Sequence, residues 1–175
     1  ELPAQSAIAV EADSGKILYE KDSEKKRDVG GLSTLLTTYL IFEAIHEKKL
    51  SLKDPIKLSE KALALNDIEG AGTLPMEANQ YTVEQLLTAL LVGNSSTAAL
   101  ALAEKVGGSE KSFVEKMKKK LAEWGIQSPH LINATGLNTQ TISGDPDGKG
   151  DENQLSAYDI AVIAKHLLQD FPEVT

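Results

Sequence analysis

One serine at the start of an apolar segment is the first candidate nucleophile of this chain. The segment 29–40 opens with two glycines and a leucine, followed by Ser33 and Thr34. A hydroxyl attacks a carbonyl efficiently only when a neighbouring base accepts its proton. Leu36 occupies the position one helical turn after Ser33 and has no basic group. We therefore expect Ser33 to begin or pack a helix and not to attack a substrate.

The sequence contains no pattern that supports a metal site or a nucleotide-binding site. His46, His130 and His166 are far apart and lack the spacing of H-E-x-x-H or similar zinc motifs. His46 and His166 fall on amphipathic helical segments, which favours positions at the surface or at its boundary with the core. The glycine pairs at 30–31 and 107–108 lack both phosphate-binding glycine patterns. We expect no cofactor.

An acidic cluster in a glycine-rich segment invites comparison with a calcium loop. Its members are Asp145, Asp147, Asp151 and Glu152. Counted from Asp145 in the EF-hand template, a lysine takes the fifth position and Ser156 the twelfth, where oxygen ligands are required. The pattern favours a solvated loop.

A run of lysines on one predicted helix is the most basic part of the chain. Lys116 and the residues 118–120 lie opposite a set of apolar positions, namely Phe113, Val114, Met117 and Leu121. This arrangement favours the solvated face of a helix packed on a core, and a peripheral membrane role is the alternative.

The hydrophobic pattern predicts an α+β fold, mostly helical with one β-hairpin. Two short strands, 7–10 and 17–21, flank an Asp-Ser-Gly turn. From residue 32 to about residue 47, apolar residues cover most faces of a helix, which predicts a central, buried position.

Capping signals place the remaining helices. Thr82 and Gln85 form a capping-box pattern, and helices 98–106 and 109–124 are separated by two glycines. Ser156 can cap a last helix of about 14 residues that ends before a Phe-Pro pair. The segments 59–79 and 143–154 read as irregular surface connections.

Composition sets limits on the classes of protein. The 175 residues, 41% of them hydrophobic, predict a single domain with a substantial core. Eighteen Lys and Arg against 26 Asp and Glu give a net charge of −8, which argues against a nucleic-acid partner. There is no cysteine, so disulfides and thiolate chemistry are excluded. No signal peptide or membrane-spanning run is visible, and the signal of a secreted parent would have been removed.

Five segments, in this order and spacing, resemble one known family. They are Ala7 to Lys21, Tyr81 to Leu87, Ala101 to Lys105, Asn133 to Leu137 and Leu155 to Asp159. Together they are similar to D-alanyl-D-alanine carboxypeptidases of the low-molecular-mass penicillin-binding proteins, of the streptococcal and lactic type from Gram-positive bacteria. The resemblance implies the amino-terminal portion of a β-lactamase/transpeptidase-like domain, located outside the cytoplasm. It also implies a peptidoglycan stem peptide or a β-lactam as ligand.

The resemblance also implies an altered active site. The family motif S-x-x-K supplies a nucleophile and a base, and this chain has Gly31 and Thr34 at those positions. The second motif, S-x-N, falls on Asn94-Ser95-Ser96, with the two polar ends exchanged. Capping and residual ligand binding both remain open for Asn94, and a structural role is favoured for Ser96. Acylation at residue 31 has no chemical route.

The third family motif, K-T-G, is absent from the 175 residues. By resemblance, the segment that carries it also supplies strands that pair with the first hairpin, and an isolated hairpin is marginally stable. We therefore expect residues 1–175 to form one incomplete domain. Its open sheet edge predicts a homodimer or a complementing carboxyl-terminal fragment.

Three interpretations follow from these observations. The first is a serine-type carboxypeptidase by descent, altered so that this chain is inactive. The second is a non-enzymatic pseudoenzyme that binds peptidoglycan peptides. The third is a structural or engineered scaffold derived from the family.

Overall fold

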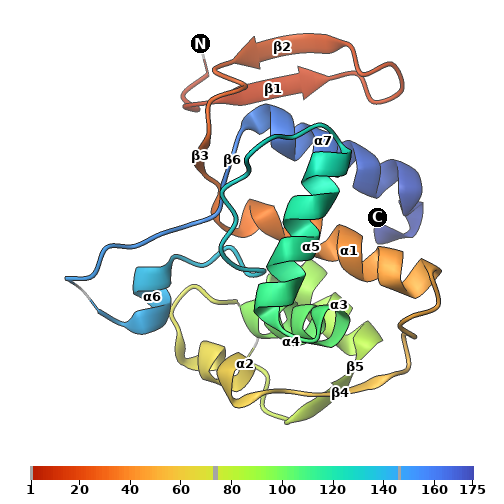
Figure 1. Ribbon diagram of the computed structural model, residues 1–175, viewed down its shortest axis with the longest axis vertical. Coiled ribbons are helices and arrows are strands. Elements are labelled where there is room, and N and C mark those ends of the chain that lie inside the picture. Colours follow the sequence, from red (N-terminus) through yellow and green to blue (C-terminus); the bar gives the residue numbers. More distant parts are fainter. Residues whose placement is uncertain (1, 73–74, 146) are drawn as a thin grey trace.

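A computed structural model describes residues 2–72, 75–145 and 147–175. Figure 1 shows a hairpin lying over one end of a helical body. The helices are α1 (Thr34–His46), α2 (Glu60–Ala64), α3 (Val83–Gly93), α4 (Ser96–Gly107), α5 (Glu110–Glu123), α6 (Thr139–Ser143) and α7 (Ala157–Asp170). The strands are β1 (Ala7–Val10), β2 (Ile17–Lys21), β3 (Arg27–Asp28), β4 (Pro55–Lys57), β5 (Gln80–Thr82) and β6 (Gln154–Leu155). Among the described helices, none has the length and apolar character that crossing a membrane requires.

The predicted hairpin is confirmed with the expected bounds. β1 and β2 pair antiparallel, with Ala7 opposite Lys21 and a bulge after Ala9. Gly15 provides the positive φ of +71° at the turn, a conformation that glycine adopts without steric cost. β1 packs on α7, whereas every residue of β2 except the last is exposed. The hairpin is therefore covered on one side only.

Two further strand pairs were not predicted from the sequence. β3 pairs with β6, and β4 pairs with β5, both antiparallel. Each of these strands has only two or three residues, too few to show an alternating pattern. The β3–β6 pair brings the chain before α1 next to the chain before α7.

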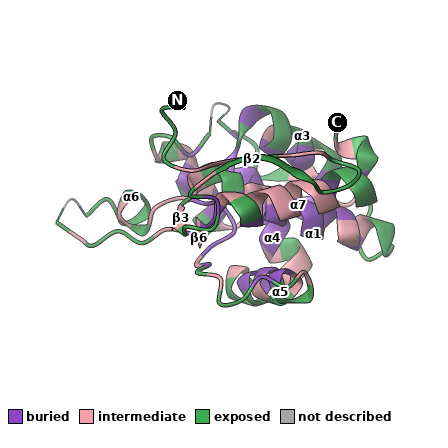
Figure 2. Ribbon diagram, turned by 90° about the horizontal axis from the view of Figure 1, so that it is seen from above, coloured by how far each residue is buried: buried purple, intermediate pink, exposed green. Residues whose placement is uncertain are grey.

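The predicted central helix is confirmed as the core of the fold. α1 has eight buried residues and packs against α4, α5 and α7. α4 contacts α1, α2, α3 and α5, and its first eight residues are all buried. Figure 2 shows the buried residues gathered in these two helices. The alanines of α4, at positions 98, 99, 101 and 103, let four neighbouring helices approach closely.

The junction of α4 and α5 depends on a glycine. A Cβ on Gly107 would lie 2.8 Å from the backbone nitrogen of Phe113, closer than a carbon can approach. Gly108 then ends α4 with φ +78°, the left-handed conformation common at helix ends. Because Gly107 has no side chain, Phe113 can enter the core, where it is fully buried.

The structure corrects one sequence prediction about the connections. The segment 59–79 contains α2, begun by Ser59, whose side chain accepts a hydrogen bond from the backbone of Ala62. Residues 73–74 of this segment, like residue 146 of the segment 143–154, lie outside the described residues. α2 is one of the shortest helices, with five residues and no periodic apolar pattern of its own, which is why the sequence read as irregular.

Capping was predicted correctly at the longer helices. Thr82 and Gln85 form the capping box of α3, and Ser156 with Asp159 forms that of α7. α7 runs for 14 residues, as expected. The predicted helix after residue 32 begins slightly later, at Thr34, because a 3-10 turn occupies residues 30–33.

Histidines and aromatic residues join α1, α5 and α7. The ring of Tyr39 meets that of Trp124 edge to face at 4.7 Å, and Trp124 stacks on His166 at 4.1 Å. His46 instead contacts Phe171 and pairs with Glu173, and it is half exposed. The prediction of a surface or boundary position is confirmed for both histidines, since His46 is half exposed and His166 is partly covered by Trp124.

Leu86 and Leu91 offer a matched test of where the core lies. Both belong to α3, but Leu86 is 0% exposed and Leu91 is 43% exposed. We expect Leu86→Ala to lower the free energy of unfolding by about 2–5 kcal/mol, because it removes buried methyl groups and leaves a cavity. Leu91→Ala should change it by less than about 0.5 kcal/mol. Urea denaturation followed by circular dichroism measures both, and equal losses would contradict this assignment of the core.

Candidate functional site

The site positions suggested by the sequence begin at the 3-10 turn that leads into α1. Gly31 lies in this turn (Gly30–Ser33), and Thr34 is the first residue of α1. The hydroxyl of Thr34 donates a hydrogen bond back to the carbonyl of Gly31 at 2.6 Å. The side chain at residue 34, where the sequence resemblance leads us to expect the family's lysine, is therefore hydrogen-bonded to the backbone of residue 31, where we expect the serine.

Asn94 faces Gly31 from the end of α3. A Cβ built on Gly31 would lie 3.5 Å from both Oδ1 and Nδ2 of Asn94, which is ordinary contact distance. Asn94 itself has φ 48° and ψ 39°, the left-handed conformation that asparagine tolerates better than most residues. The structure thus brings Gly31, Thr34 and Asn94 together from segments about sixty residues apart.

The structure assigns different capping roles to the residues of the second motif. Asn94 terminates α3 and takes no part in capping α4, which corrects the sequence expectation for this residue. Ser95 alone caps α4, accepting a hydrogen bond from the backbone of Ala98 at 3.2 Å. Ser96 is buried as the first residue of α4, and its backbone N–H donates to the carbonyl of Ala71 at 2.6 Å. Ser96 therefore anchors the segment that follows α2.

Ser33 has the structural role that the sequence favoured. It is fully buried, and its hydroxyl donates to the carbonyl of Gly30 at 2.9 Å. The same hydroxyl accepts a hydrogen bond from Nδ2 of Asn153, also at 2.9 Å. Both interactions fix the turn, and neither partner is a base that could activate the hydroxyl.

Asn153 is the residue that sequence reasoning missed. It is 0% exposed, and its Oδ1 accepts hydrogen bonds from the backbone N–H groups of Ile132 and Asn133 at 2.8 and 3.2 Å. Its own carbonyl accepts from the N–H of Val29 at 3.1 Å. One asparagine therefore connects the turn before α1, the loop after α5 and the strand β6. In the sequence it is one polar residue in a polar loop, with nothing to distinguish it.

The Asn-Ala-Thr-Gly-Leu segment, residues 133–137, packs directly against the turn that holds Gly31. A Cβ on Gly136 would lie 2.1 Å from the carbonyl oxygen of Gly30, and φ at Gly136 is +77°. Only glycine fits both the space and the backbone conformation. The hydroxyl of Thr37 donates to the carbonyl of Ala134 at 2.7 Å and ties the same loop to α1. This segment, one of the marks of the family resemblance, thus holds the site in shape.

The groups assembled here are neutral. Thr34 and Asn94 supply a hydroxyl and an amide, and behind them Ser33, Asn133 and Asn153 form a hydrogen-bonded layer. Such groups can donate to or accept from a peptide, but they supply no proton acceptor comparable to lysine.

The side chains described next, whose pKa values are shifted, lie away from this cluster. Burial, with a hydrogen bond to Asp170, raises the pKa of Tyr39 well above its ordinary value. The hydrogen bond from His130 lowers the pKa of Asp151, and that from His46 lowers the pKa of Glu173. These groups serve the aromatic junction and the surface rather than residues 31, 34 and 94.

The acidic loop uses its carboxylates in local contacts. Asp145 accepts from the backbone of Asp147 at 3.1 Å, Asp151 pairs with His130 at 2.7 Å, and Glu152 accepts from Asn138 at 2.8 Å. Within residues 2–72, 75–145 and 147–175, no group of three or more His, Cys, Asp or Glu is arranged to hold a metal ion.

Comparison with known proteins gives a consistent result. Residues 1–175 match the family model described as D-alanyl-D-alanine carboxypeptidase. The D-alanyl-D-alanine carboxypeptidase DacF of Bacillus subtilis is 32% identical over 166 residues, covering 95% of this chain and 39% of that protein.

Solved structures share the fold. A peptidoglycan synthesis regulatory factor (PBP3) from Streptococcus pneumoniae matches with a TM-score of 0.92 at 46% identity, covering 99% of this chain and 49% of that one. Penicillin-Binding Protein D2 from Listeria monocytogenes, in its cefotaxime-bound form, matches with a TM-score of 0.80 at 25% identity, covering 99% of this chain and 65% of that one. The chain spans less than half the length of the Bacillus and Streptococcus proteins.

Asn153→Ala tests the hydrogen-bonded layer behind the site. The change leaves the buried N–H groups of Ile132 and Asn133 without their acceptor, so we expect the free energy of unfolding to fall by about 2–4 kcal/mol. Asn79→Ala, at an exposed asparagine, should cost less than about 0.5 kcal/mol. Chemical denaturation measures the loss, and amide hydrogen exchange at Ile132 and Asn133 should rise in the first variant only. Unchanged exchange would show that Asn153 does not hold this loop.

Proposed function

Because the chain belongs to the D-alanyl-D-alanine carboxypeptidase family, we propose that it forms part of a cleft that binds the D-Ala-D-Ala end of a peptidoglycan stem peptide without cleaving it. Members of this family act on peptidoglycan. The observation that carries the proposal is the meeting of Gly31, Thr34 and Asn94 at the start of α1.

The absence of catalysis follows from the chemistry of residues 31 and 34. A serine enzyme of this kind needs a hydroxyl to attack the carbonyl and an amine to accept its proton. Gly31 has no side chain, and the hydroxyl of Thr34 is bonded to a backbone carbonyl. Ser33, the nearest other hydroxyl, is fully buried and bonded to Gly30 and Asn153. No group in this cluster meets both requirements.

The position of Asn94 favours a protein that still binds a peptide over a purely structural scaffold. Its amide lies beside the backbone of Gly31, with one donor and one acceptor end within contact distance of the missing side chain. An amide can pair with a peptide N–H and C=O at once. The exchanged motif therefore keeps hydrogen-bonding capacity where the family binds its ligand. On this proposal the protein works outside the cytoplasm, where peptidoglycan is located.

The first prediction of this proposal concerns β-lactams. Penicillin acylates a live serine, so intact-protein mass spectrometry after exposure of this chain should show no added mass. An active carboxypeptidase with an intact S-x-x-K motif serves as the positive control. A stoichiometric adduct on Ser33 or Ser96 would overturn the proposal.

Titration with a peptide then distinguishes a peptide-binding pseudoenzyme from a structural scaffold. A stem peptide ending in D-Ala-D-Ala should shift amide resonances of Gly31 and Asn94 in a saturable way, and one ending in L-Ala-L-Ala should not. Asn94→Ala should weaken binding by roughly tenfold, the effect of losing one or two hydrogen bonds to the ligand. The absence of any saturable shift would favour the scaffold.

The third prediction concerns assembly, and it rests on the open hairpin. Ile17, Leu18 and Tyr19 on β2 are 43%, 63% and 43% exposed, and β1–β2 is a sheet of only two strands. Such an edge favours pairing with another strand, from a second copy or from a complementing carboxyl-terminal fragment. Light scattering over a concentration series should show dimerisation of the isolated chain, and Ile17→Lys should weaken it. A monomer at every concentration, unaffected by this substitution, would contradict the prediction.

A further inference from the structure

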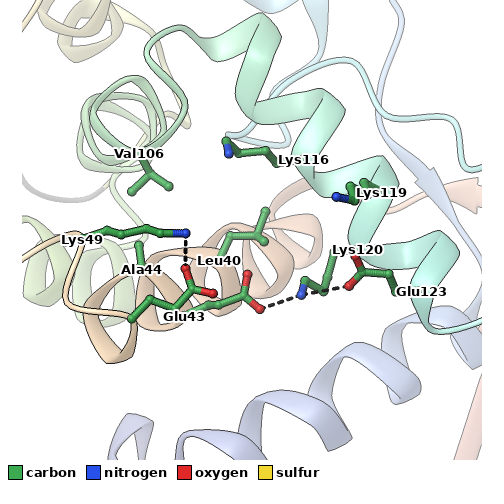
Figure 3. Close-up of a pocket in the computed structure, with 10 residues that line it drawn as sticks. Leu40, Glu43, Ala44, Lys49, Val106, Lys116, Lys119, Lys120 and Glu123 are labelled. Carbon is green, nitrogen blue, oxygen red and sulfur yellow. Dashed lines mark hydrogen bonds and ion pairs between the residues drawn. The ribbon is translucent and has the colours of Figure 1, made fainter.

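A hollow between α1 and α5 collects lysines at the opposite end of α1 from Gly31. It has a volume of about 170 Å³. Figure 3 shows lysines of α5 on one side and Lys49, just after α1, on the other. Its residues are Leu40, Glu43, Ala44, Glu47, Lys49, Val106, Lys116, Lys119, Lys120 and Glu123. The hollow is thus built from four lysines, three glutamates and a small apolar floor, in a chain whose net charge is −8.

The three glutamates of the hollow are all engaged. Lys120 lies between Glu43 and Glu123, at 2.6 and 3.1 Å, and Lys49 pairs with Glu47 at 2.5 Å. Burial alone would lower the pKa of Lys120, but the hydrogen bonds to its two carboxylates outweigh burial and raise it. Lys120 is therefore firmly charged, and its charge is balanced locally.

Lys116 and Lys119 have no carboxylate partner of this kind. In the described part of the chain, neither forms an ion pair, and both side chains are exposed. Their spacing of three residues puts them on one face of α5, and Figure 3 shows both ammonium groups at the hollow. Two like charges held side by side repel each other, and an anion between them would relieve that repulsion. Lys116 also acts on the far side of the hollow, where it helps Lys49 to lower the pKa of Glu47.

We propose that this hollow binds a phosphate group through Lys116 and Lys119, with Lys49 at its edge. A water molecule in the liquid occupies about 30 Å³, so the hollow has room for the five heavy atoms of a phosphate. Lysine binds phosphate as a point charge, and a multiply charged anion gains most from two adjacent ammonium groups. The carboxylates of Glu43 and Glu47 face the same space. Lys49 pairs with Glu47, Lys120 lies between Glu43 and Glu123, and the four lysines of the hollow exceed its three glutamates by one positive charge. This binding is independent of the peptide cleft.

Inorganic phosphate is the probe for the test. Titration at constant ionic strength, with chloride as the reference salt, should shift the Nζ and amide resonances of Lys116 and Lys119 to saturation. The double variant K116Q/K119Q should weaken phosphate binding at least tenfold. K111Q/K118Q is the matched control, because it removes the same two charges from the same helix at lysines that line a different hollow. All variants should keep the melting temperature of the parent chain.

The source of the phosphate is tested with vesicles. Phosphatidylglycerol vesicles that bind the parent chain but not K116Q/K119Q would assign a lipid headgroup, and phosphate binding without vesicle binding would assign a soluble phosphate. Both support the site. A shift that chloride reproduces, an equal loss in K111Q/K118Q, or vesicle binding that survives in K116Q/K119Q would overturn it.

Discussion

Burial of α1 is the constraint on which the rest of the structure depends. α7 lies against it on the side of the hairpin, α4 crosses it in the core, and α5 covers its carboxyl-terminal half. A helix surrounded in this way cannot rotate or slide without opening the core, because protein interiors are close-packed. Both ends of α1 are therefore fixed in space. The candidate cleft lies at its start, and the lysine-lined hollow lies at its end.

The proposed function separates the shape of the candidate site from its reactivity. Shape comes from backbone contacts, above all the approach of Gly136 to Gly30, and from the buried amide of Asn153. On the proposed assignment, reactivity in the family depends on the side chains of a serine and a lysine, which the resemblance places at positions 31 and 34. Glycine and threonine at these positions would then remove the chemistry at little cost to the contacts that shape the site. This separation explains how a chain can match solved penicillin-binding structures so closely and yet have no nucleophile at residue 31.

The two ends of α1 differ in their electrostatics. At the start, every group of the described cluster is neutral, and recognition depends on hydrogen bonds with fixed directions. At the end, the proposed recognition depends on charge, with the exposed side chains of Lys116 and Lys119 at the hollow. The first arrangement suits a peptide that must be oriented, and the second suits an anion that needs no particular orientation.

The sequence by itself determined the local features of the fold. The hairpin, the capping boxes at Thr82 and Ser156, and the buried character of α1 each depend on residues a few positions apart, so their signals survive without knowledge of the fold. The resemblance also led to the prediction that the family's altered motif positions fall at 31, 34, 94 and 96.

Only the tertiary structure decided how those positions meet. It placed Asn94 beside Gly31, buried Asn153 against Ser33 and set Lys49 opposite the lysines of α5. These contacts join residues some 60 to 120 positions apart, and each depends on how whole helices pack. A single polar residue such as Asn153 looks the same in the sequence whether it lies in solvent or in the core. Its environment, and hence its role, depends on how distant elements pack around it. The residues next to it in the sequence do not reveal that packing.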